Sequence, residues 1–320
     1  MRRVLLMFVL VGVMPAVGLG QRTEQAPVPQ VQVFRSAVSM VALNVTVTDA
    51  DGFVAGLQKE DFAIFEDGVQ QPIHFFEARD VPIDLILLLD TSSSIRDRLS
   101  VVHTAAIGFM RTLRPGDRGA VVTFGDNVQV PQPLTSDRAL LESAILSTRA
   151  YGGTSLYNAL YIALRQFGRA AQDAGEMRRQ AFVVLSDGED TASLLAFDDV
   201  LTQARRSGVS VYTIHLLSGI EAPTARLARQ QSDSEFAMRR LADDTGGLTF
   251  TATEAGMLSG IYAGIAEELA SQYSMGYVPT DDDGDGRFRR ISVRIADRPN
   301  LRPRARAGYL PSGRAVAGRR

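Results

Sequence analysis

Hydrophobic and polar residues alternate in short runs near the beginning of this chain. Residues 41–48 form a β-branched stretch with a period of two, and turn-forming Asp and Gly follow at 49–52. Residues 61–68 repeat this order of strand and turn, and residues 73–76 have the pattern of a further short strand. The alternation predicts a small β unit over residues 31–80.

The middle of the chain has a different pattern, in which apolar runs alternate with stretches of helical periodicity. Residues 83–89 are nearly all apolar, as in a strand buried on both faces of a sheet. Further strands are predicted at 119–124, 128–131, 181–185, 209–216 and 248–251. Helices are predicted at 96–113, 137–148, 156–169, 198–206, 235–243 and 254–271. This order predicts an α/β domain over residues 82–271, built on a doubly wound, mostly parallel sheet.

The C-terminal part returns to the strand pattern, with strands predicted at 273–279, 288–295 and 301–309. Because the two ends of a chain often lie close together, we expect these strands to pair with the N-terminal β unit. The expected fold is therefore the α/β domain with a smaller β-rich companion formed by the flanks, residues 31–80 and 272–311. Residues 312–320 are expected to be a frayed tail.

The N-terminus has the three-part pattern of a secretory signal peptide. Arg2 and Arg3 precede an almost entirely apolar stretch over residues 4–19, and small residues lead into a polar segment. We expect residues 1–20 to be a signal peptide and the proline-containing residues 21–30 to be a linker. An uncleaved anchor is the alternative, because the apolar stretch is close to the shortest that spans a bilayer. The protein is thus expected in the periplasm, at the cell surface or secreted, without stable membrane insertion after cleavage.

Composition narrows the class of partner and of chemistry. The net charge is only −2, so no general attraction to nucleic acid is expected. The chain has no cysteine, which excludes disulfides, thiolate metal ligands and a cysteine nucleophile. His74, His103 and His215 fall in three different predicted elements, and no pair has metal-ligand spacing. The sequence contains no nucleophile elbow, zinc-protease motif or P-loop.

Three loops at the ends of predicted elements carry oxygen-bearing side chains. Residues 90–94 have the sequence Asp-Thr-Ser-Ser-Ser and directly follow the first buried strand. Residues 152–155, Gly-Gly-Thr-Ser, place Thr154 just before a helix, and residues 186–190 place Asp187 just after a later buried strand. In an open α/β sheet, ligands bind beyond the carboxyl ends of the strands, where the strand order reverses. The three loops are therefore candidates for a single site.

If the two buried strands are neighbours, Asp90 and Asp187 lie over one crevice, and Ser92 and Ser94 can turn toward the same point. With Thr154, the site would offer two carboxylates and three hydroxyls. Such hard oxygen ligands suit Mg²⁺, with Mn²⁺ or Ca²⁺ as further options. For the first loop taken alone, helix capping by Ser94 without a metal is the alternative.

Together these loops resemble the metal-ion-dependent adhesion site (MIDAS) of von Willebrand factor type A (vWA) domains, and all five positions match. The resemblance covers about residues 83–271. It implies that Ser92, Ser94 and Thr154 coordinate the metal directly, while Asp90 and Asp187 act partly through bound waters. It also implies an open sixth position, which an acidic side chain of a partner protein often fills.

The flanks resemble a vWA-related family that is common in acidobacteria. This resemblance rests on residues 61–68, on 273–279 with its Gly-Tyr-Val-Pro, and on 304–309. The function of that family is poorly defined. The resemblance therefore supports the fold and export, and says little about the ligand.

Two other features have competing interpretations. Residues 281–286 are similar to the start of a calcium loop, but Ser292 occupies the position of the EF-hand glutamate. We expect an acidic hairpin turn, with weak calcium binding by Asp281, Asp283 and Asp285 as the alternative. The C-terminal arginines are interpreted as outward-facing strand positions and a solvated tail, with contact to anionic lipid or cell-wall polymer as the alternative. They are Arg302, Arg304, Arg306, Arg314, Arg319 and Arg320.

The sequence thus predicts an exported, non-enzymatic binding module in which a divalent cation bridges to an acidic group of a protein partner. One alternative is a structural component of an envelope assembly, in which the metal only ties the three loops together. A hydrolase with Asp90 as nucleophile is a further alternative. It is disfavoured because no lysine lies near Asp90 to balance phosphate charge.

Overall fold

A computed structural model describes residues 40–78, 81–174, 178–186, 190–217, 225–280 and 285–311, all within one compact unit. The predicted signal peptide, linker and C-terminal tail lie outside the described residues, and so do Asp187, Asp281 and Asp283. Within the described ranges, no helix is long and apolar enough to cross a membrane.

The core of the molecule is a six-stranded sheet with the order β10-β9-β8-β5-β6-β7. Its strands are β5 (Ile83–Asp90), β6 (Arg118–Phe124), β7 (Val128–Thr135), β8 (Arg179–Ser186), β9 (Ser210–Leu216) and β10 (Thr249–Ala252). All neighbours pair in parallel except β7, which runs antiparallel to β6 at the edge. The predicted doubly wound, mostly parallel α/β sheet is confirmed.

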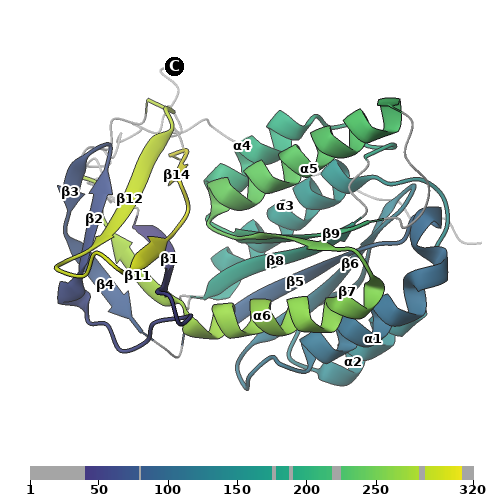
Figure 1. Cartoon of the computed structure of the whole chain (residues 1–320), viewed down its shortest axis with the longest axis horizontal. Helices are drawn as coiled ribbons and strands as arrows, with labels where there is room; N and C mark the ends of the chain where they lie inside the picture. The colour runs from purple at the N-terminus through teal and green to yellow at the C-terminus, as the bar shows by residue number, and fades with distance from the viewer. Residues whose placement is uncertain are drawn as a thin grey trace, which may run out of the picture. The chain divides into compact units, whose positions relative to one another are not determined.

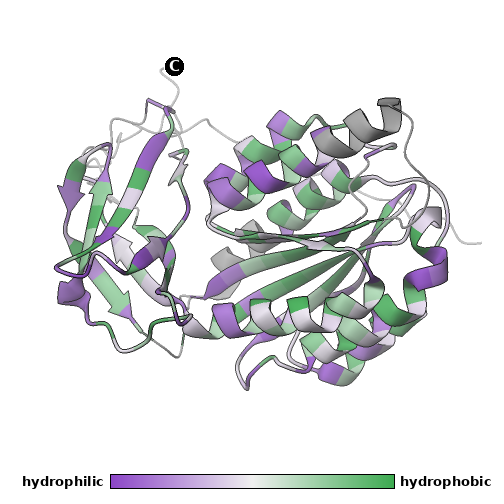
Figure 2. Ribbon diagram, viewed as in Figure 1, coloured by the Kyte–Doolittle hydropathy of each residue, from purple (hydrophilic) through white to green (hydrophobic). Residues whose placement is uncertain are grey.

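Helices cover both faces of this sheet (Figure 1). On one face lie α1 (Leu99–Met110), α2 (Arg138–Ser147) and α6 (Leu258–Ser271), and on the other α3 (Leu156–Ala174), α4 (Phe197–Ser207) and α5 (Ala225–Thr245). Every residue of β5 is buried, with Leu85 and Leu87 packed on the first face and Ile86 and Leu88 on the second. This explains the continuous apolar run, and Figure 2 shows the central strands as the most hydrophobic part of the domain.

The flanks form two antiparallel four-stranded sheets, here called the β companion. The first has the order β13-β1-β11-β4, from β13 (Arg302–Arg304), β1 (Val41–Thr48), β11 (Tyr273–Tyr277) and β4 (Ile73–Glu77). The second has the order β14-β12-β2-β3, from β14 (Gly308–Tyr309), β12 (Arg289–Ile295), β2 (Phe62–Glu66) and β3 (Val69–Gln71). Side chains from both sheets, including Val45, Ile64 and Tyr277, share one hydrophobic core. The predicted β companion from both flanks is confirmed.

Some predicted elements were wrong in their extent. The strand predicted at 128–131 continues to Thr135, because a strand at the sheet edge tolerates proline. The helix predicted at 235–243 begins at Ala225, in a stretch too polar to show helical periodicity. The helix predicted at 96–113 is a 3-10 segment, η2 (Ser93–Arg98), followed by the shorter α1. The single strand predicted at 301–309 is divided into β13 and β14, which lie in different sheets.

The prediction that the C-terminal arginines point outward was wrong for Arg304 and Arg306. Arg304 donates to the backbone carbonyls of Gly246 and Gly247 and forms an ion pair with Glu268 at 2.5 Å. The Arg306 guanidinium lies 5.3 Å from the centre of the Tyr309 ring, and burial lowers the pKa of Arg306. These side chains turn inward because the β companion packs on the α/β domain at this point.

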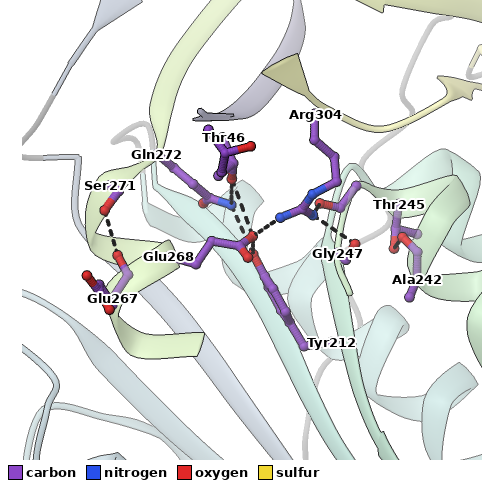
Figure 3. Close-up of polar contacts among 12 residues, drawn as sticks. Thr46, Tyr212, Ala242, Thr245, Gly247, Glu267, Glu268, Ser271, Gln272 and Arg304 are labelled. Atoms are coloured by element: carbon purple, nitrogen blue, oxygen red, sulfur yellow. Dashed lines mark hydrogen bonds and ion pairs between the residues drawn. The ribbon is translucent and has the colours of Figure 1, made fainter. Parts of the chain in front are cut away.

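A buried polar network joins the two parts of the molecule (Figure 3). Glu268 of α6 is 1% exposed, and its Oε1 atom accepts hydrogen bonds from Tyr212 at 2.6 Å and from Thr46 at 3.3 Å, besides the ion pair with Arg304. Gln272 donates to the Tyr212 hydroxyl at 3.0 Å. Burial, and then the charge of Glu268, raise the pKa of Tyr212 well above its usual value, so the phenol stays protonated and donates.

Candidate metal centre

The first of the three loops begins where β5 ends. Asp90, the last residue of β5, is completely buried, at 0% exposure. Its Oδ1 atom accepts a hydrogen bond from the backbone amide of Ser92 at 2.7 Å, and its Oδ2 atom accepts one from the hydroxyl of Ser186 at 2.8 Å. Ser186 ends β8, the parallel neighbour of β5. Asp90 therefore ties its own loop to the end of the adjacent strand.

The hydroxyl oxygens of Ser92 and Ser94 lie 2.8 Å apart. Ser92 is buried, whereas Ser94 is exposed, so the pair lies at the surface. Two ligands at right angles around one ion, each at about 2.0–2.1 Å, lie about 2.9 Å from each other. The two hydroxyls form a hydrogen bond of ordinary length with each other, and the same separation is compatible with neighbouring ligands of an octahedral Mg²⁺ site. The alternative of helix capping by Ser94 is not supported, because Ser94 lies inside η2, the segment that leads into α1, and the N-cap of η2 is Ser92, without a side-chain capping bond.

Backbone hydrogen bonds hold the second loop against the first. The amide of Tyr151 donates to the carbonyl of Thr91 at 2.8 Å, and the amide of Ser93 donates to the carbonyl of Gly152 at 3.1 Å. Gly152 has a φ of +73°, a conformation that favours glycine and that allows the loop to turn here. Thr154, two residues further, is 4% exposed. The loop of Thr154 therefore lies directly beside the two serines.

The segment after the third loop contacts the second loop. The amides of Thr191 and Ala192 donate to the carbonyl of Thr154 at 2.9 and 3.0 Å, and the amide of Thr154 donates to the hydroxyl of Thr191 at 2.9 Å. Asp187 itself lies outside the described residues, but Ser186, which precedes it in the chain, contacts Asp90. The structure thus brings together the loops that carry Asp90, Ser92, Ser94 and Thr154.

The chemistry of these side chains fits a hard divalent cation. Their ligand atoms are all oxygens, and Mg²⁺ prefers oxygen ligands while keeping some of its waters. No group of three His, Asp or Glu side chains suited to a metal occurs within the described ranges.

Asp126 is a further carboxylate beside these loops, and the sequence interpretation did not include it among the site residues. It lies in the turn between β6 and β7, and its Oδ1 atom accepts a hydrogen bond from the amide of Gly153 at 2.6 Å. A Cβ atom on Gly152 would lie only 2.1 Å from Asp126 Oδ2, so the carboxylate packs closely against this loop. The signal was available, because Asp126 also follows the carboxyl end of a buried strand beside β5.

We expect Asp126→Ala to weaken Mg²⁺ binding by about 10–100-fold, as loss of an outer partner of a metal site usually does. The reason is that Gly153 loses its acceptor, and the loop that carries Thr154 is no longer held in place. Asp126→Asn, which keeps a carbonyl oxygen for that amide, should restore most of the affinity. Titration calorimetry with MgCl₂ measures both variants, and equal binding by the alanine variant and the wild type would contradict this role.

Among the described residues, the other candidate ligands do not converge. His74 lies in β4, His103 in α1 and His215 in β9. Asp285, the described carboxylate of the acidic loop, accepts a hydrogen bond from the amide of Arg287 and lies 3.4 Å from the side chain of Arg289. This arginine partner favours the acidic turn over calcium binding.

Comparisons with known proteins agree with this fold. The family model "von Willebrand factor type A domain" matches residues 84–263. A "UPF0353 protein" from Mycolicibacterium paratuberculosis is 28% identical over 228 residues, which are 66% of this chain and 67% of that protein.

Two of the solved structures to which this chain is similar are the following. A von Willebrand factor type A protein from Catenulispora acidiphila has a TM-score of 0.50 and 14% identity, over 87% of this chain and 75% of that one. Proximal thread matrix protein 1 from the mussel byssus, with a zinc-occupied MIDAS motif, has a TM-score of 0.49 and 18% identity, over 64% of this chain and 49% of that one. Since the family model covers more than half of the chain and the six-stranded sheet has the expected topology, this protein belongs to the von Willebrand factor type A domain family.

Proposed function

We propose that this protein is an exported binding module that holds one Mg²⁺, or Mn²⁺ or Ca²⁺, through Asp90, Ser92, Ser94, Thr154 and Asp187. Domains of this family commonly mediate protein–protein interactions. The observation that carries the proposal is the Ser92–Ser94 hydroxyl pair at 2.8 Å, beside a buried Asp90 that is tied to β8. Export is proposed from the signal-peptide pattern of residues 1–20.

The side chains have distinct roles in this proposal. Ser92, Ser94 and Thr154 would hold the ion directly, and Asp90 fixes the first loop through its bond to the Ser92 amide. A bound cation would supply an open coordination position that attracts a carboxylate. The partner is therefore proposed to be a protein that presents an acidic side chain, and affinity would depend on both metal and partner geometry. No bond is made or broken, so no catalytic residue is assigned.

A pull-down with the tagged protein from a cell-envelope extract tests the proposal. We expect a protein to be retained in MgCl₂, to be released by EDTA, and to bind again when Mg²⁺ is restored. Conversion of the partner's carboxylates to amides should abolish the binding. Retention that is equal in EDTA and in Mg²⁺ would favour a metal with a purely structural role, in which case chelation lowers only the melting temperature.

A further inference from the structure

One large apolar side chain near the metal centre is almost fully exposed. Leu194 is 95% exposed, although the turn that carries it is held by several hydrogen bonds. The side-chain oxygen of Asn158 accepts hydrogen bonds from the backbone amides of Leu194 and Leu195 at 3.2 and 3.3 Å. The backbone amide of Asn158 donates to the Ser193 hydroxyl at 3.0 Å. The fold thus holds the backbone of this turn in place, while the leucine at its tip contributes nothing to the core.

The turn lies beside the loop of Thr154. The amide of Ala192 donates to the carbonyl of Thr154 at 3.0 Å, and two residues of chain span at most about 7 Å. Leu194 is therefore within that distance of a residue that contacts the metal-site loop. Tyr151, three residues before Thr154 on the same loop, is a second large apolar side chain, 47% exposed. Single exposed apolar residues are common, but these two belong to the loops around one site.

A positive charge lies next to the same site. Arg98 donates from one guanidinium nitrogen to the carbonyl of Ser94 at 3.0 Å and from the other to the carbonyl of Leu217 at 2.9 Å. Ser94 is the exposed member of the serine pair. A carboxylate approaching Ser94 therefore also approaches this guanidinium, which offsets part of the negative charge of Asp97, Asp126 and Asp190 on the surrounding loops.

We propose that Leu194 and Tyr151 form an apolar rim that binds a large aliphatic or aromatic side chain adjacent to the acidic residue of the partner. This inference rests on the proposed function, and it specifies which residue types the partner presents to the site. The partner segment is an exposed protein loop in which Asp or Glu stands next to a residue such as Leu, Ile or Phe. The carboxylate provides the metal-dependent contact, and the apolar neighbour selects among acidic loops.

A random peptide library displayed on phage tests both the metal-dependent acidic contact and the apolar preference. Selection on the wild-type protein in MgCl₂, with elution by EDTA, should enrich peptides with an acidic residue beside a large apolar one. Selection on Leu194→Ser should still enrich acidic peptides but lose the apolar preference. Leu140→Ser is the matched control. Leu140 is 47% exposed near the start of α2, which follows β7. Because β7 runs antiparallel to β6, it ends at the opposite end of the strands from the candidate metal centre.

The size of the effect on affinity is measured with one selected peptide that is synthesised with a fluorophore. We expect Leu194→Ser to bind it about tenfold more weakly than wild type, as loss of a buried leucine contact predicts, and Leu140→Ser to bind it equally. Acidic enrichment without an apolar neighbour, or a preference unchanged by Leu194→Ser, would overturn the rim and leave the proposed function standing. An absence of Mg²⁺-dependent enrichment would overturn the rim together with the proposed function.

Discussion

Asp90→Asn should bind Mg²⁺ about 10–100-fold more weakly than the wild type while it keeps its fold. The amide oxygen can still accept from the Ser92 amide, and the new NH₂ group can donate to the Ser186 hydroxyl, which also accepts hydrogen bonds. The negative charge next to the cation is lost. The shape and the hydrogen bonds are thus kept, and the affinity for the metal is the property that falls.

Thermal unfolding in MgCl₂ measures this difference. At a Mg²⁺ concentration 100 times its dissociation constant, the wild type should gain about 2.7 kcal/mol of stability. A variant with 100-fold weaker affinity should gain about 0.4 kcal/mol at the same concentration. Asp97→Asn is the matched control, since Asp97 is an exposed carboxylate in η2 and should leave the gain unchanged. A wild type that gains nothing from Mg²⁺, Mn²⁺ or Ca²⁺ would contradict the metal site.

The positions of the first loop could be predicted because they follow from strand physics. An unbroken apolar run at 83–89 requires cover on both faces, which places Asp90 at the carboxyl end of a central strand. The sequence alone does not establish that the two buried strands are neighbours. The structure shows that β5 and β8 pair in parallel. The contacts that hold Thr154 beside the serines join segments about sixty residues apart, such as Ser93 and Gly152, and no local pattern encodes them.

The contacts between the domains could not be predicted for the same reason. Arg304 follows the alternation of an exposed strand, and Glu268 has the spacing of an ordinary polar residue on a helix. Glu268 is buried, and Arg304 is partly buried, where the β companion packs at the end of α6. Tertiary packing, not local periodicity, decides the environment of both side chains.

Glu268→Ala should lower the free energy of unfolding by about 3–5 kcal/mol, the usual cost of removing one partner of a buried ion pair. Its Oε1 atom is the acceptor for Tyr212 and Thr46 and the partner of Arg304 (Figure 3). Without it, the buried phenol of Tyr212 loses its acceptor, and the guanidinium of Arg304 loses its counter-charge. The side chain of Arg304 is 29% exposed, so water can compensate in part, and we expect the lower end of this range.

Urea unfolding followed by circular dichroism measures the loss. Glu267→Ala is the matched control, because Glu267 is the preceding residue of the same helix and is exposed, and it should change stability by about 0.5 kcal/mol or less. Glu268→Gln keeps an oxygen acceptor for Tyr212 but removes the charge, so it should fall between the wild type and Glu268→Ala. Because Glu268 joins α6 and β9 of the α/β domain to β1 and β13 of the companion, its loss should weaken both parts in one transition. If Glu268→Ala costs no more than Glu267→Ala, apolar packing holds the companion in place and the polar network adds nothing to stability.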